Sequence, residues 1–231
     1  MKTLYFITCL FMLCLCSCTR YYYCPNAMNV PLLSKEKQAR VVVSTGASDE
    51  VNNTNYQLAY SPLQHLGIMA NYTSYKGESK ASASLREFGA GYYYSDGGKA
   101  KLVLDVYGGF GGGYFHSDVN MNFQRFFVQP GIGLRTKYFD MAFNIRVCAI
   151  KYTQFDANGQ SLDYLEQQHL IDADGIRIDS KAHTFIESAF TLRGGSKHIK
   201  LQVQFLGVNA VGYIPWKYES GLTSVGIYVG F

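Results

Sequence analysis

Strict alternation of apolar residues with polar or small ones is the feature that most constrains this chain. The clearest example is residues 139–152, FDMAFNIRVCAIKY. One parity of this segment is apolar from Phe139 to Ala149, whereas the other carries Asp140, Asn144 and Arg146. Because successive side chains of an extended chain point to opposite faces, this pattern predicts a β-strand with one apolar and one polar face.

The same period recurs from residue 40 to the C-terminus. Comparable segments predict ten strands, at 40–46, 54–61, 65–76, 85–95, 100–115, 122–137, 138–152, 182–193, 198–209 and 222–231. Tight turns alternate with longer links, and an even number of strands so connected is typical of a transmembrane β-barrel. We therefore predict an all-β fold in which residues 40–231 form a single antiparallel up-and-down transmembrane β-barrel of about ten strands. Eight strands is the alternative, if 40–46 and 54–61 lie outside the barrel.

Alternation by itself does not decide which face of the barrel is inside. A soluble lipocalin-like barrel buries its apolar face, whereas a membrane barrel turns that face to lipid and has a polar interior. Several predicted strands have about 10 or more residues, which suffices to cross a bilayer at a tilt. Aromatic residues gather near strand ends, as at membrane interfaces, and glycines gather on the polar parity. These features favour the membrane barrel, and a soluble, lipid-tethered binding barrel is the alternative.

The N-terminus has the layout of a secretory signal. Lys2 precedes an apolar stretch at 4–15, which is shorter than the about 20 residues of a membrane-spanning helix. Leu15-Cys16-Ser17-Cys18 then resembles the bacterial lipobox. In proteins that match it, diacylglycerol is attached to the cysteine sulfur and a peptidase cuts before that residue. The resemblance therefore implies a signal peptide at 1–17 and lipidation of Cys18.

Residues 18–39 show no period and are predicted to be a lipidated tether. After cleavage, Cys24 and Cys148 are the cysteines left beside Cys18. Two such residues do not make a disulfide scaffold.

The chain ends SVGIYVGF, and a last strand that ends in Phe231 resembles the insertion signal of outer-membrane barrels. With the lipobox, a tether beginning YYYCPN and ten alternating segments, the chain resembles the small outer-membrane β-barrel lipoproteins of Gram-negative bacteria. The resemblance implies a place in the cell outer membrane with an anchor at Cys18. It also implies contact with outer-membrane lipid, and insertion by the barrel-assembly machinery. It assigns a class of protein and no activity.

Charged residues on the polar parity face the lumen if the barrel spans a membrane. They are Arg40, Glu87, Asp105, Arg125, Arg135, Asp140, Arg146, Glu187, Arg193 and Lys200. Buried charges are costly unless they are paired and hydrogen-bonded. These acids and bases largely satisfy one another, which predicts a lumen closed by paired charges and a structural or surface-interaction role. The alternative is a narrow, basic-lined pore for anions or other small solutes.

Catalysis requires a nucleophile and a base within hydrogen-bond reach. His116, Ser117 and His183 lie on the predicted loop side but form no recognisable motif, and no GxSxG elbow is present. We assign no catalytic, cofactor-binding or metal-binding residue, and a lipid-modifying enzyme is kept only as an alternative. The net charge of +4 includes no basic run, which argues against nucleic-acid binding.

The connection at 153–181 is long for a compact domain, and such loops usually carry function. Asp163 and Glu166 have the spacing of a capping box and predict a short helix over the outer mouth. The alternation of turns places this loop on the exterior. We expect either a lid or a contact surface for an extracellular ligand or protein.

Overall fold

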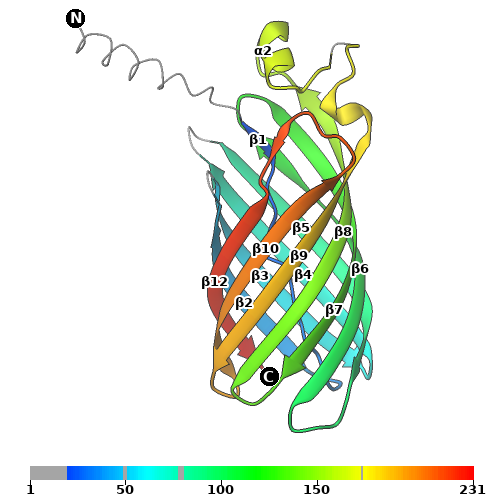
Figure 1. Ribbon diagram of the computed structural model, residues 1–231, viewed down its shortest axis with the longest axis vertical. Coiled ribbons are helices and arrows are strands. Elements are labelled where there is room, and N and C mark those ends of the chain that lie inside the picture. Colours follow the sequence, from blue (N-terminus) through cyan, green and yellow to red (C-terminus); the bar gives the residue numbers. More distant parts are fainter. Residues whose placement is uncertain (1–19, 49–50, 78–80, 173) are drawn as a thin grey trace, which may run out of the picture.

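The computed structural model describes residues 20–48, 51–77, 81–172 and 174–231. The predicted signal peptide and Cys18 lie outside these residues. Within them, ten antiparallel strands close into one barrel (Figure 1). The barrel strands are β2 (Ala39–Ala47), β3 (Val51–Leu63), β4 (Leu66–Gly77), β5 (Ser82–Ser95), β6 (Lys101–His116), β7 (Asn120–Arg135), β8 (Phe139–Asp156), β9 (Ala182–Gly195), β10 (Ile199–Val211) and β12 (Gly221–Gly230).

The predicted fold class is confirmed. Each predicted segment corresponds to one barrel strand, with ends that differ by a few residues. β2 pairs with β12 on one side and with β3 on the other, so the segments at 40–46 and 54–61 belong to the wall. Because both segments are paired in the wall, the barrel formed by the described residues has ten strands and not eight.

The apolar parity faces outward. On β8, the side chains of Phe139, Met141, Phe143, Ile145 and Val147 are each between 37% and 45% exposed, and the residues between them are buried. Exposed Leu, Ile, Val, Phe and Tyr side chains cover the other strands in the same way. This is the arrangement of a membrane barrel and the reverse of a lipocalin.

The two ends of the barrel differ. At the end that we call the turn end, short connections join consecutive strands, and the C-terminus lies there (Figure 1). At the opposite end, the loop end, the connection between β8 and β9 carries α2 (Leu162–Gln167) and the short 3-10 helix η1 (Ile178–Ser180). The link from β10 to β12 also lies at the loop end and contains β11 (Lys217–Tyr218).

The helix α2 begins earlier than predicted. Its N-cap is Ser161, whose Oγ accepts a hydrogen bond of 3.2 Å from the backbone N–H of Tyr164. The predicted capping box at Asp163 and Glu166 is therefore wrong, because the serine side chain already satisfies the first free N–H groups. None of the helices among the described residues is long and apolar enough to cross a membrane.

The prediction of a tether is wrong for residues 20–38. This stretch, which we call the lumen segment, enters at the loop end, runs down inside the barrel and joins β2 at the turn end (Figure 1). It begins with β1 (Tyr21–Tyr23), which pairs in parallel with β11. Ala27, Met28 and Leu33 have no exposed surface. Because wall residues surround the segment on all sides, its sequence shows neither the period of a strand nor that of a helix.

Candidate functional site: the occupied lumen

Wall side chains bind the backbone of the lumen segment. Nε2 of Gln57 donates to the carbonyl of Ala27 at 2.7 Å. Gln204 accepts from the N–H of Met28 at 2.7 Å and donates to the carbonyl of Met28 at 3.0 Å. Further wall donors reach the carbonyls of Pro25 (from Asn53), Asn26 (from Arg146), Asn29 (from Gln129), Val30 (from Arg193) and Leu32 (from Arg40). Amides and guanidinium groups thus replace the strand partners that an extended buried segment lacks.

A cluster of charges surrounds the segment at mid-height. Among the described residues, Glu87, Arg125, Arg146 and Glu187 form this central cluster, and each has at most 1% of its side chain exposed. Arg125 lies 3.5 Å from Glu87 and 2.9 Å from Glu187. Arg146 contacts Glu187 through Nε and lies 4.0 Å from Glu87. The acids and bases balance, as buried charges require.

The strand register brings these residues together. Arg146 on β8 is the direct cross-strand partner of Glu187 on β9. Glu87 on β5 and Arg125 on β7 are both register partners of Gly111 on β6, which stands between them. A Cβ atom at Gly111 would lie 2.7 Å from Cγ of Glu87. The glycine therefore leaves the space in which the Glu87 side chain reaches Arg125.

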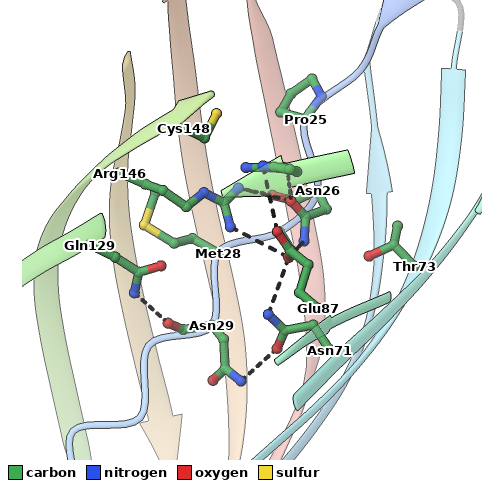
Figure 2. A network of polar contacts seen from close by, with 12 residues as sticks. Pro25, Asn26, Met28, Asn29, Asn71, Thr73, Glu87, Gln129, Arg146 and Cys148 are labelled. Carbon is green, nitrogen blue, oxygen red and sulfur yellow. Dashed lines mark hydrogen bonds and ion pairs between the residues drawn. The ribbon is translucent and has the colours of Figure 1, made fainter. Parts of the chain in front are cut away.

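Asn26 of the lumen segment completes the central cluster (Figure 2). Its Nδ2 donates to Oε2 of Glu87 at 2.9 Å. Its Oδ1 accepts from Arg125 at 3.0 Å and from Arg146 at 2.8 Å. The hydroxyl of Tyr23 also donates to Glu187. The segment thus supplies neutral groups that bridge both signs of charge within the buried network.

Four basic side chains, Arg40, Arg135, Arg193 and Lys200, form a basic collar nearer the turn end. Lys200 pairs with Asp140 at 2.6 Å. The arginines instead bind the lumen segment: Arg193 to the carbonyl of Val30 at 2.6 Å, Arg40 to that of Leu32 at 3.1 Å, and Arg135 to Oγ of Ser34 at 2.8 Å. In this part of the lumen the segment offers oxygen acceptors to the bases of the wall.

Asp105 is the predicted lumen charge that the structure does not bring to a partner. It is buried, and neither carboxylate oxygen has a hydrogen bond or an ion pair within the described part of the chain. Its register partners are Tyr93 on β5 and Gly131 on β7, and beyond Gly131 lies Asn144 on β8. The predicted lumen charges therefore fall into the central cluster, the basic collar with Asp140, and this isolated acid.

Sequence reasoning missed the lumen segment and its neutral partners. One signal for it was available, since residues 21–34, YYYCPNAMNVPLLS, contain no charged side chain. A solvated tether is normally rich in charge and poor in apolar residues. The wall amides Gln57, Gln129 and Gln204 lie on the polar parity, but nothing in their spacing named a peptide as their partner.

At the loop end lies a smaller polar group, which we call the mouth cluster: Tyr22, Asp118 and Tyr164. Tyr22 donates to Asp118 at 3.1 Å, and the hydroxyl of Tyr164 donates to the same carboxylate oxygen. Burial alone would raise the pKa of Asp118, but hydrogen bonds from Ser117, Tyr164 and Tyr22 outweigh it and lower the pKa below its usual value. Burial and the Asp118 contact raise the pKa of Tyr164 to about 12. The charged carboxylate of Asp118 therefore links α2, through Tyr164, to the lumen segment, through Tyr22.

His116 and His183, which were considered as possible catalytic residues, form hydrogen bonds with groups other than a serine nucleophile. Nδ1 of His116 lies 2.9 Å from Oδ1 of Asn120, and Nε2 of His183 lies 3.0 Å from the carbonyl of Ile178. Within the described residues, neither histidine is hydrogen-bonded to a serine. No group of three His, Cys, Asp or Glu residues in that part of the chain is placed to hold a metal ion.

The fold and the occupied lumen define a closed antiparallel β-barrel of the membrane type, with its own N-terminal segment inside. The sequence matches no family model and no curated protein. Among solved structures, the chain is similar to the crystal structure of the N-terminal β-barrel domain of Pseudomonas aeruginosa OprF. The TM-score is 0.43 and the identity 8%, over 85% of this chain and 98% of that one.

Proposed function

We propose that this protein is an outer-membrane β-barrel lipoprotein whose N-terminal segment closes the lumen, with a structural or surface-interaction role at its loop end. The observation that carries this proposal is the lumen segment itself. Wall side chains bind its backbone along the length of the barrel, from the carbonyl of Pro25, which Asn53 binds, to the carbonyl of Leu32, which Arg40 binds. A solute would have to displace these hydrogen bonds in order to pass.

The exterior of the wall supports a place in a membrane. Soluble monomers rarely expose contiguous apolar surface of more than a few hundred Å², yet apolar side chains cover the outward parity of the barrel strands. Phe231 follows β12 at the turn end, and its N–H donates to the carbonyl of Ala39 at 3.0 Å. We assign this residue to the insertion signal that the barrel-assembly machinery recognises, with long loops outside and short turns in the periplasm.

The hydrogen bonds of the basic collar favour a closed lumen rather than an anion pore. The donors that would attract an anion are Arg40, Arg135 and Arg193, and each of them already binds an oxygen of the lumen segment. Planar-bilayer recordings of the purified full chain test this assignment. We expect no steady conductance, and a steady anion-selective current would contradict a closed lumen.

Fractionation tests the membrane assignment independently. We expect heat-modifiable migration on gels and extraction only by detergent. Release by alkaline carbonate from the variant Cys18→Ala, which cannot be acylated, would instead identify a soluble barrel.

We further propose acylation at Cys18, on the basis of the sequence Leu15-Cys16-Ser17-Cys18. Mass spectrometry of the mature N-terminal peptide should show a lipid-modified cysteine. An unmodified terminus at another residue would contradict this assignment, and the variant Cys18→Ala is the control.

The loop end offers the surface for an extracellular ligand or protein. Leu162, Ile176 and Tyr213 are exposed there, and Tyr213 is 86% exposed. Buried Leu165, on α2, belongs to the hydrophobic cluster beneath, so this surface has an ordered base. Deleting residues 157–178 should leave the barrel able to insert and abolish binding at this end.

A further inference from the structure

We infer that the chain threads its own barrel, so that the acyl chains on Cys18 enter the outer leaflet of the outer membrane, on the cell surface. This inference rests on the proposed membrane location and acylation. It adds a topology in which the first and last residues of the mature chain lie on opposite faces of the membrane. A lipid-anchored tether at the periplasmic face would place them on the same side.

The start of the lumen segment is fixed at the loop end. The N–H of Arg20 donates to Oε1 of Gln168, just after α2, at 3.1 Å. Tyr21 pairs with Lys217 of β11, and the ammonium of Lys217 lies 4.4 Å from the centre of the Tyr21 ring. Both partners belong to the long connections.

The other end of the segment is fixed at the turn end. Gln38 accepts from Ser61 through its backbone carbonyl at 3.0 Å, close to the turn that joins β3 and β4. Arg135, which binds Ser34, ends β7 beside the turn that joins β7 and β8. The C-terminal Phe231 lies at this same end, bonded to Ala39. The segment therefore covers the distance between the two rims of the barrel.

The position of Arg20 limits which leaflet of the membrane the acyl chains on Cys18 can reach. Two residues of chain reach at most about 7 Å, whereas the hydrocarbon core of a bilayer is ~30 Å thick. An acyl chain on Cys18 therefore cannot reach the periplasmic leaflet around the outside of the barrel. The acyl chains cannot pass through the lumen either, because the lumen segment occupies it. The outer leaflet is therefore the apolar phase that the acyl chains on Cys18 can reach.

Labelling with a membrane-impermeant maleimide on intact cells tests this topology. The background carries Cys24→Ser and Cys148→Ala, while Cys18 is kept because acylation blocks its thiol. Arg20→Cys and Lys35→Cys probe the two ends of the lumen segment, at a partly exposed and an exposed position. Leu162→Cys on α2 marks the loop end, and Gly97→Cys in an open turn marks the turn end. The acylation state of each variant is read by mass spectrometry.

We expect positions 20 and 162 to react on intact cells, and positions 35 and 97 to react only after the outer membrane is permeabilised. If 162 reacts on intact cells but 20 does not, the start of the lumen segment is not at the cell surface and the leaflet inference fails, while the place of the barrel in the outer membrane stands. If 97 and 35 react on intact cells and 162 does not, the orientation is inverted, and both proposals fail. Reaction of all four only after permeabilisation would overturn the surface location. An unmodified Cys18 would contradict both the proposed acylation and the leaflet assignment, and would leave the membrane barrel itself in place.

Discussion

Gln204 of the wall binds Met28 of the lumen segment through both polar groups of the Met28 backbone, at 2.7 and 3.0 Å. A single side-chain amide thereby reproduces the pair of hydrogen bonds that a neighbouring strand would supply. The geometry recognises the extended backbone at this position and makes no use of the methionine side chain.

We predict that Gln204→Leu destabilises the closed barrel. The substitution leaves one N–H and one carbonyl of Met28 buried without a partner, at a cost of about 1–3 kcal/mol each. The urea midpoint of unfolding in detergent should fall accordingly. Gln124→Leu, on the outward face of β7, is the matched control and should leave the midpoint nearly unchanged. Equal midpoints for the two variants would show that this bidentate contact does not hold the segment.

Asn26→Asp should disrupt the central cluster. The change replaces the Nδ2 donor with a carboxylate oxygen facing Oε2 of Glu87 at about the present separation of 2.9 Å. An uncompensated buried charge typically costs about 3–5 kcal/mol. We expect a loss of stability of that size, measured by urea unfolding, or conversion of the barrel to a conducting form in planar bilayers.

The double variant Asn26→Asp with Glu87→Gln restores the charge balance of the cluster. We expect it to recover most of the lost stability, because the two sites are in direct contact and their effects are therefore not additive. Additive losses in the double-mutant cycle would show that Asn26 and Glu87 act separately.

The mouth cluster should respond to acid. Because the folded pKa of Asp118 is lowered, its hydrogen bonds contribute stability above the unfolded pKa, about 3.9 for aspartate. That stability is lost as the pH falls from there through the folded pKa. Trp216, the single tryptophan of the chain, is buried at the loop end and reports on this region by fluorescence. We expect a fluorescence change below about pH 4, and no such change in Asp118→Asn. An equal response from the variant would assign the change to another group.

Protease added to intact cells should cut the loop end first. Residues 174–177 are exposed, whereas Leu165, Leu170 and Ile178 are buried on either side of them. A protease of broad specificity should therefore nick the chain at 174–177 and leave the barrel heat-modifiable, since exposed backbone is cut preferentially. Cleavage that appears only after the periplasm is opened would invert the orientation.

The wall of the barrel was predictable because each strand has one face against lipid and one against the lumen, which imprints a period of two on the sequence. Parity also located the ten inward charges, from Arg40 to Lys200. Their partners were not predictable, because Glu87 meets Arg125 across Gly111, and that contact depends on the register of three strands. The direction of the faces was predicted from strand length and from the positions of aromatic residues and glycines, and the exposure of residues such as Phe143 confirms it.

The lumen segment was not predictable from periodicity, since a chain enclosed on all sides has no solvent face to mark one parity. Two-residue β11 gave no signal either, because its pairing with β1 joins positions almost two hundred residues apart. For the N-cap of α2, Ser161 was the stronger candidate than Asp163 once the backbone was known. A cap is recognised by its backbone geometry as much as by its residue type.

The pairing of β12 with β2 links the lumen segment to the closure of the barrel. These strands are the last and the first of the wall, so their contact is the seam at which the barrel closes. The lumen segment runs directly into β2 and is bonded to the wall at successive levels, so it cannot leave the closed ring unless these hydrogen bonds break. Residues 20–38 are therefore coupled through β2 to the seam itself. The hydrogen bonds that hold the segment inside the lumen thus also help to hold closed the wall that encloses it.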